Sequence, residues 1–258
     1  MQIITLTTDF GTQDWFAGAM KGVILGIAPR AVVVDLTHEL PAGEVRGGAF
    51  ALAAGCRWFP KGAVHVAVVD PGVGSARKAI AVKTADYFFV GPDNGVLSLA
   101  LTRENIRSVH RLENEKFFLT PVSRTFHGRD IFAPVAAHLS RGVAIHQLGP
   151  AQKDFVRLPW PKPRQARTGL EGEVVFIDRF GNTITNIENS RLNSPGNYRI
   201  FAGRKCLCPV KDFYQAVPAA QAVAVPGSSG FLEIAVNGGS AAQRFRLKIG
   251  DRVNLRQR

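Results

Sequence analysis

The sequence predicts an α/β N-terminal domain, with a mostly parallel sheet covered by helices on both faces, followed by a smaller all-β, barrel-like C-terminal domain. Over residues 1–150, apolar strands alternate with helical stretches, the pattern of a sheet that is buried on both faces. Residues 151–168 break the alternation with proline and basic residues, as in a solvated linker. Residues 169–258 contain short strands separated by polar turns, which is typical of a small barrel.

The N-terminal elements follow from the spacing of apolar residues. Residues 3–8 are a β-branched run that predicts the first strand, and residues 15–27 have helical spacing that stops before Pro29. Ligands bind beyond the carboxyl ends of strands in such sheets, so we expect a site after the first and third strands. The other expected elements are a strand at 31–36, a helix at 44–55, a strand at 63–69, a hairpin of 79–83 and 87–90, and a helix at 131–140.

The C-terminal elements are all expected to be strands. Polar turns at 178–182, 227–230 and 237–240 lie next to apolar runs and mark where the chain reverses. The expected strands are 172–177, 183–187, 198–202, 204–208, 231–236 and 244–249.

The composition is that of a globular protein. None of the 258 residues belongs to an apolar run of about 18, the length that spans a membrane, and the first residues lack the features of a signal peptide. Three cysteines fit a reducing compartment, which predicts a cytoplasmic location. Cys206 and Cys208 have no further Cys or His close in sequence, and no HExxH spacing occurs, so we expect no metal.

The net charge of +12 raises the question of a nucleic-acid partner. The basic residues do not form one compact block, because they concentrate in both 153–167 and 244–258, and few aromatic residues accompany them. Binding of single strands needs aromatic side chains on which bases stack. We therefore expect no nucleic-acid partner.

Three N-terminal segments contain candidate functional residues. Asp9, with Asp14, lies at a strand-to-helix junction, where a carboxylate either accepts both ribose hydroxyls or caps the helix. Asp70 begins a Pro-Gly-Val-Gly turn, and Arg77 can pair with it, either in a functional site or in a turn stabilised by its own salt bridge. His127, before the helix that Asp130 is expected to cap, is either an acid–base group or structural.

The polar turns of the second domain are candidates for binding a base. An asparagine amide can recognise a purine edge, and a phenylalanine can stack on the ring. The alternative for each turn is that its polar residues serve the turn alone.

Taken together and in this order, five segments make the chain resemble the S-adenosylmethionine (SAM) hydroxide adenosyltransferase, or SAM hydrolase, family, which is related to fluorinase and chlorinase. The segments are Thr8–Gly11, Val69–Gly74, Phe126–Asp130, Asp178–Asn182 and Leu232–Asn237.

The resemblance implies a homotrimer in which SAM lies between the N-terminal domain of one subunit and the C-terminal domain of the next. It implies a catalytic triad of Asp70, Arg77 and His127, with Asp9 at the ribose hydroxyls. Phe180, Asn182 and the backbone from Val236 to Gly238 would contact adenine. The methionine end would face Asp14, Asp178, Ser228 and Glu233. The full expected substrate-binding set is Asp9, Asp14, Phe126, Asp178, Phe180, Asn182, Ser228, Glu233, Val236, Asn237 and Gly238.

The resemblance also implies a reaction. The halogenases have a tyrosine at the position of Asp70, and the fluorinase has a serine at that of Gly128. A halide needs no base, whereas water does, so the triad favours attack of water on C5′ of SAM to give adenosine and methionine. SAM would be the substrate, with no cofactor and no metal. The alternatives are a protein that binds SAM or adenosine with little turnover, and a SAM-dependent halogenase.

Overall fold

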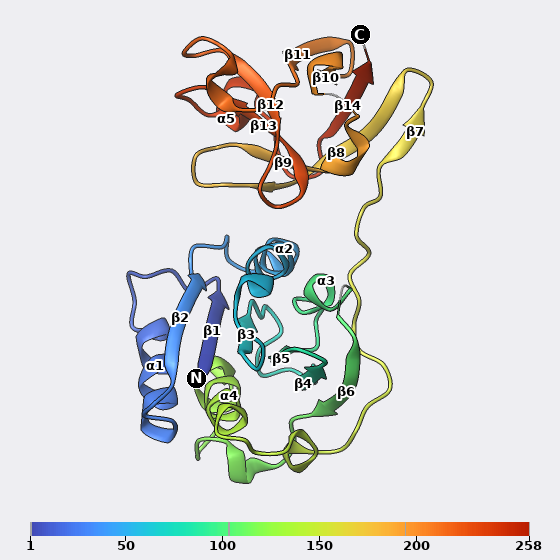
Figure 1. The fold of residues 1–258 in the computed structure, drawn as a ribbon. Helices are drawn as coiled ribbons and strands as arrows, with labels where there is room; N and C mark the ends of the chain where they lie inside the picture. Colours follow the sequence, from blue (N-terminus) through green and yellow to red (C-terminus); the bar gives the residue numbers. More distant parts are fainter. Residues whose placement is uncertain (1, 103, 194, 258) are drawn as a thin grey trace. The chain divides into compact units, whose positions relative to one another are not determined.

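The computed structural model describes residues 2–102, 104–193 and 195–257. The chain divides into two compact units, Met1–Pro159 (unit 1) and Trp160–Arg258 (unit 2), which are coloured from blue to yellow and from yellow to red in Figure 1.

Unit 1 is built on a sheet in the strand order β2-β1-β3-β5-β4-β6. β2, β1, β3 and β5 pair in parallel, whereas β4 is antiparallel to both of its neighbours. The sheet is therefore mixed. The connection between β4 and β5 is too short for a parallel crossover, so these two strands form an antiparallel hairpin. The elements are β1 (Ile3–Thr8), α1 (Phe16–Ile27), β2 (Val32–Thr37), α2 (Val45–Gly55), β3 (Val64–Val68), β4 (Ala79–Thr84), β5 (Phe88–Pro92), α3 (Ser98–Leu101), β6 (Ile106–Arg111) and α4 (Ala133–Ser140).

Helices cover both faces of this sheet. In β2, Asp35 pairs with Lys21 of α1, whereas the side chain of the next residue, Leu36, lies against Gly55 of α2. Neighbouring residues of a strand point to opposite faces, so α1 and α2 lie on different sides.

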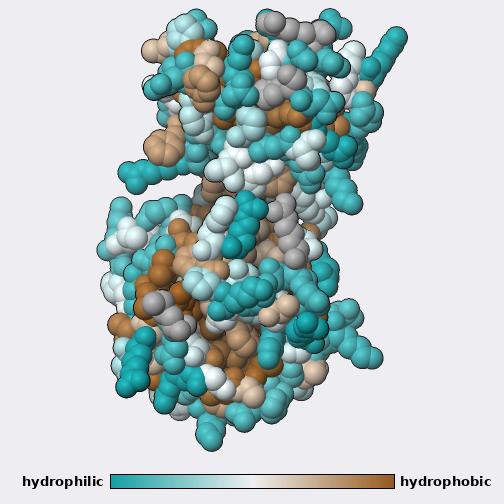
Figure 2. Space-filling view, viewed as in Figure 1, coloured by the Kyte–Doolittle hydropathy of each residue, from teal (hydrophilic) through white to brown (hydrophobic). Residues whose placement is uncertain are grey.

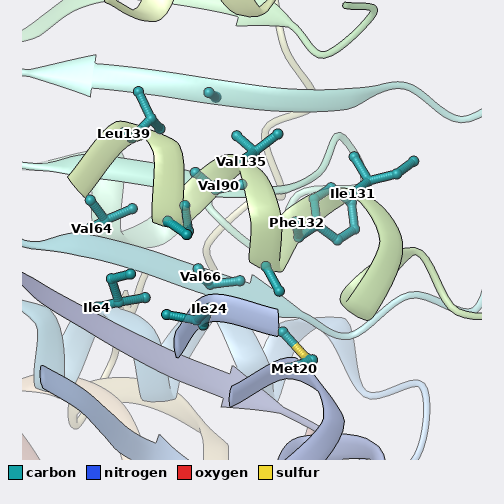
Figure 3. Packing of buried hydrophobic residues seen from close by; sticks show 14 of the residues in the cluster. Ile4, Met20, Ile24, Val64, Val66, Val90, Ile131, Phe132, Val135 and Leu139 are labelled. Atoms are coloured by element: carbon teal, nitrogen blue, oxygen red, sulfur yellow. The ribbon is translucent and has the colours of Figure 1, made fainter. Parts of the chain in front are cut away.

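The core of unit 1 lies between the sheet and the helices α1 and α4. Figure 3 shows Val135 and Leu139 of α4 beside Val64 and Val66 of β3, all four of which are buried. Burying each such side chain contributes about 1.5–3 kcal/mol. This packing fixes α4, and with it the loop that leads into α4.

The start of α4 differs from the prediction. A π-helical turn, Gly128–Phe132, precedes the α-helix. Asp130 lies inside this turn, where its side chain accepts a hydrogen bond from the Ser123 N–H at 2.8 Å. It therefore ties down the preceding loop, and the predicted N-cap role for Asp130 is wrong.

In the described part of unit 2, eight strands form a nearly closed antiparallel barrel, in the order β11-β10-β14-β8-β9-β13-β12, with β7 paired to β8. A bridge between Val210 and Ala224 brings the two ends of the sheet together. The elements are β7 (Arg164–Ala166), β8 (Gly169–Ile177), β9 (Thr183–Glu188), β10 (Tyr198–Ala202), β11 (Lys205–Pro209), β12 (Ala222–Pro226), β13 (Phe231–Val236), α5 (Ala241–Phe245) and β14 (Arg252–Gln257).

One predicted strand is wrong. Residues 244–249 contain the end of α5 and a turn, and the last strand begins only at Arg252. Ser240 caps α5 by accepting from the Gln243 N–H at 3.2 Å, and Arg246 ends it in the left-handed conformation with φ 55°. Local capping therefore outweighs the alternating pattern of basic and apolar residues that had indicated a strand.

On the face shown in Figure 2, hydrophobic side chains gather over the middle of unit 1 and hydrophilic ones surround them. Across the described ranges, no helix combines the length and the apolar character needed to cross a membrane.

Candidate active site

Asp70, Arg77 and His127 form a continuous chain of polar contacts in unit 1. Arg77 Nε donates to Asp70 Oδ2 at 2.8 Å, and Arg77 Nη2 lies 2.7 Å from His127 Nδ1. The side chains of Asp70 and Arg77 are only 4% and 11% exposed. The guanidinium also lies over the ring of Phe132, with Cζ 5.3 Å from the ring centroid. The sequence-predicted triad is thus brought together in space.

A glycine makes this contact possible. Gly74, with φ 77°, follows β3, and a Cβ at this position would lie 2.2 Å from the carbonyl oxygen of Arg124. Only glycine permits this backbone conformation together with such a close approach. Gly74 therefore lets the turn that carries Asp70 and Arg77 pack against the loop that carries His127.

That loop is held at its other end by Asp130, which is 1% exposed. Arg129 Nε donates to Asp130 Oδ1 at 2.6 Å, in addition to the bond from Ser123. Burial by itself would raise the pKa of Asp130, but these hydrogen bonds outweigh burial and lower that pKa. The carboxylate stays charged and holds the loop.

The hydrogen bond to Arg77 fixes the tautomer of His127. A guanidinium only donates, so His127 Nδ1 accepts, and the proton of the neutral ring is on Nε2. Burial lowers the pKa of His127, and the positive charge of Arg77 lowers it further, against the opposing charges of Asp70 and Asp130. His127 is therefore neutral near pH 7.

Two members of the triad, Asp70 and His127, border a cavity of about 410 Å³ in unit 1. Asp9, Asp70 and His127 all line it. Its wall includes Phe126, whose ring packs edge-on against Phe10 and Phe16, with centroids 5.8 and 5.1 Å away. The cavity thus combines carboxylates, an imidazole and an apolar wall.

Asp9 does not cap α1. Its Oδ2 accepts from the Gly43 N–H at 2.7 Å, and Trp15, the N-cap residue of α1, makes no capping bond with its side chain. Asp14 is exposed and lines a neighbouring hollow of about 370 Å³, which Asp9 also borders. Of the two alternatives for Asp9, the structure disfavours capping.

Unit 2 contains a larger cavity, of about 890 Å³. It is bordered by every residue that the sequence analysis assigned to the C-terminal domain, which are Asp178, Phe180, Asn182, Ser228, Glu233, Val236, Asn237 and Gly238. Phe180 is 77% exposed, so its ring is accessible for stacking.

Asp178 orients Asn182. Its two carboxylate oxygens accept from the backbone N–H and from Nδ2 of Asn182, at 2.8 and 3.0 Å. The bond to Nδ2 fixes which side of the amide is the donor, and the other N–H and the carbonyl oxygen remain available to a ligand.

Sequence reasoning missed Phe213 and Tyr214, which also line this cavity. The Tyr214 hydroxyl donates a short hydrogen bond to Glu233. Burial raises the pKa of Glu233, and the charge of Asp178 adds to this rise against the opposing bond from Tyr214. The sequence signal for these residues is a pair of adjacent aromatic side chains flanked by polar residues. Their link to the site is not visible in the sequence, because Glu233, the partner of Tyr214, belongs to β13.

Within the described ranges, no group of three His, Cys, Asp or Glu side chains could hold a metal ion.

The chain is thus a two-unit protein with an α/β unit, an all-β unit and a polar cavity in each. The SAM hydroxide adenosyltransferase N-terminal domain profile matches residues 4–149, and the C-terminal domain profile matches residues 172–254. The chain therefore belongs to the SAM hydroxide adenosyltransferase family, as the sequence motifs predicted.

Individual relatives agree with this assignment. The chain is 42% identical to an (R)-S-adenosyl-L-methionine hydrolase of Salinispora tropica, over 98% of this chain and 97% of the relative. A fluorinase of an Actinoplanes species is more distant, at 27% identity over 98% and 97% of the two chains. The crystal structure of an uncharacterised conserved protein from Thermotoga maritima matches with a TM-score of 0.93 at 38% identity, covering 99% of this chain and all of that one.

Proposed function

We propose that this chain hydrolyses SAM to adenosine and L-methionine by in-line attack of water on ribose C5′. The observation that carries the proposal is that Asp70 and His127, which Arg77 links, line one cavity together with Asp9. The identity to SAM hydrolases over nearly the whole chain supports the same reaction.

The expected ligand contacts divide between the two cavities. In unit 1, Asp9 accepts the ribose hydroxyls and Phe126 contributes to the apolar wall. In unit 2, Phe180 stacks on adenine and Asn182 pairs with its edge, beside the backbone from Val236 to Gly238. Asp14, Asp178, Ser228 and Glu233 are assigned to the methionine end. Asp178 also orients Asn182.

The charge of the cavity in unit 2 suits this substrate. Asp178 and Glu233 line it, and none of the described lining residues is Lys, Arg or His. SAM carries a sulfonium and an ammonium group, whereas the protein as a whole is strongly basic. A local excess of carboxylates favours binding of such a cation over anionic nucleotides.

In the chemical step, the water oxygen forms a bond to C5′ while the C5′–S bond breaks. The electron pair of that bond goes to sulfur, so methionine leaves as a neutral thioether and needs no general acid. Because Arg77 occupies Nδ1 of His127, we assign the departing proton of water to the Asp70 carboxylate. Nε2–H of His127 orients the attacking oxygen, and Arg77 stabilises its developing charge.

We further propose a homotrimer in which neighbouring subunits share each SAM molecule, residues 1–150 contributing the triad and residues 169–258 completing the site. This proposal rests on the family relation. We also propose a cytoplasmic location, supported by three cysteines that are free of disulfide bonds.

Incubation with SAM followed by chromatography tests the reaction. We expect adenosine and methionine in equal amounts, also in halide buffer. A 5′-halogenated nucleoside would identify a halogenase, and SAM recovered bound but unconverted would identify a binding protein; either result would refute hydrolysis.

A further inference from the structure

A buried chain of polar contacts, which the reaction above does not use, holds the turn that carries Asp9. Thr8 Oγ1 lies 2.7 Å from His38 Nδ1, and both residues are buried. On the other side of the ring, His38 Nε2 lies 3.0 Å from Asp35 Oδ1. The two groups are close enough for a charge contact, but they are not aligned as a hydrogen bond. Lys21 Nζ donates to Asp35 Oδ2 at 2.6 Å. The chain of contacts thus runs from α1 to the residue before Asp9.

The direction of each contact follows from its partner. Nε2 of His38 faces a carboxylate and carries the ring proton, so Nδ1 accepts from the Thr8 hydroxyl. Thr8 Oγ1 in turn accepts from the Phe10 N–H at 3.3 Å. The carbonyl oxygen of His38 accepts from the Gly11 N–H at 2.7 Å. His38 is therefore connected to residues on both sides of Asp9.

The charge at the far end of the chain is stable. Burial would raise the pKa of Asp35, but the hydrogen bond from Lys21 and the contact with His38 outweigh burial and lower that pKa. Asp35 remains ionised and keeps the proton of His38 on Nε2.

Asp, His and Thr are also the residue types of a nucleophilic triad, but Thr8 cannot act as a nucleophile here. It is 0% exposed, so no substrate can reach its hydroxyl. Its oxygen is already engaged with His38 and Phe10. The arrangement therefore has a positional role.

We propose that His38, supported by Asp35, is a positioning residue that fixes the Asp9 carboxylate for the ribose hydroxyls through Thr8. The inference rests on the proposed function, in which Asp9 binds ribose. The Gly43 N–H holds one carboxylate oxygen of Asp9, and the contacts of His38 hold the backbone on either side. Losing them loosens the ribose site without touching the groups that act on water.

The same strand supplies a matched control. Thr5 Oγ1 lies 2.7 Å from His65 Nδ1, and Thr5 and His65 are each 0% exposed, but Thr5 lies further from the Asp9 turn. Thr8→Val and Thr5→Val remove the same group with little change of shape. We expect Thr8→Val to raise the Kd for adenosine and the KM for SAM about three- to tenfold, the weight of one hydrogen bond, with kcat little changed. Thr8→Ser restores both constants, and Thr5→Val leaves both near wild type.

Calorimetry with adenosine and steady-state kinetics with SAM, run together with Asp9→Ala, decide the outcome. If Asp9→Ala weakens adenosine binding while Thr8→Val behaves like Thr5→Val, the positioning role is overturned and the proposed function stands. If Asp9→Ala leaves adenosine binding intact, the ribose assignment fails and the positioning role fails with it. If Thr8→Val does not fold, His38→Ala compared with His65→Ala gives the same test.

Discussion

Removing the charge of Arg77 should change turnover, stability and pH dependence together. Arg77→Gln leaves Asp70, with a side chain only 4% exposed, without its cation, and breaking a buried pair costs about 3–5 kcal/mol. Since the cavity reaches Asp70, we expect a loss near the lower end, about 3 kcal/mol, in the free energy of unfolding. Adenosine formation should slow about 10²–10⁴-fold, the usual contribution of a proton-transfer unit.

The pH profile supplies the sharper signature. Burial and the charge of Arg77 both lower the pKa of His127, whereas Asp70 raises it. Arg77→Gln removes one lowering cause and keeps the opposing one, so the pKa of His127 rises. If turnover needs neutral His127, the acid limb of log kcat/KM against pH moves to higher pH. Arg77→Lys keeps the charge and should keep the limb near its wild-type position.

The assay is adenosine formation measured by chromatography across pH, with chemical denaturation of each variant in parallel. An acid limb that is unmoved in Arg77→Gln, or turnover equal to wild type, would refute the reasoning and reduce the triad to a salt-bridged turn.

Three further predictions follow from single contacts. Asp9→Ala and Asn182→Ala should weaken adenosine binding before they affect kcat, and calorimetry giving wild-type Kd values would contradict their assignment. Gly74→Ala should lower both the melting temperature and kcat, because its Cβ meets the Arg124 carbonyl, whereas Gly62→Ala, at φ 88° with open space around it, should lower only stability. Burial lowers the pKa of His65 from 6.5 to about 4, so the unfolded state binds the proton at a higher pH than the folded state does. The free energy of unfolding should therefore fall by about 3 kcal/mol as the pH falls from about 6.5 to 4. The non-titrating His65→Gln should flatten that dependence in denaturation curves, and an unchanged slope would show that His65 is not its source.

Most helices and strands are predictable from the sequence because the residues that begin and end them act within a few positions. Examples are the helix that ends before Pro29 and the polar residues that follow the first and third strands. The alternating residues 244–249 predict a strand, and this prediction is wrong. The helix cap at Ser240, which lies just before this run, favours α5 instead.

Long-range contacts were not predictable. The role of His38 does not follow from the sequence, because its partner Thr8 belongs to a different strand and the two residues meet only when β1 and β2 pair. The sequence places Gly74 in a turn, but it does not show that the glycine allows a close approach of the backbone at Arg124. Tyr214 was missed because Glu233 belongs to a different strand. In each case the residue type was informative, and the partner depended on the tertiary fold.

The source of the new oxygen tests the central claim most directly. Turnover of SAM in water enriched in ¹⁸O, followed by mass spectrometry of both products, should place the heavy isotope on the 5′ oxygen of adenosine and none in methionine. Adenosine without the label, or a label found elsewhere in the products, would contradict attack of water on C5′.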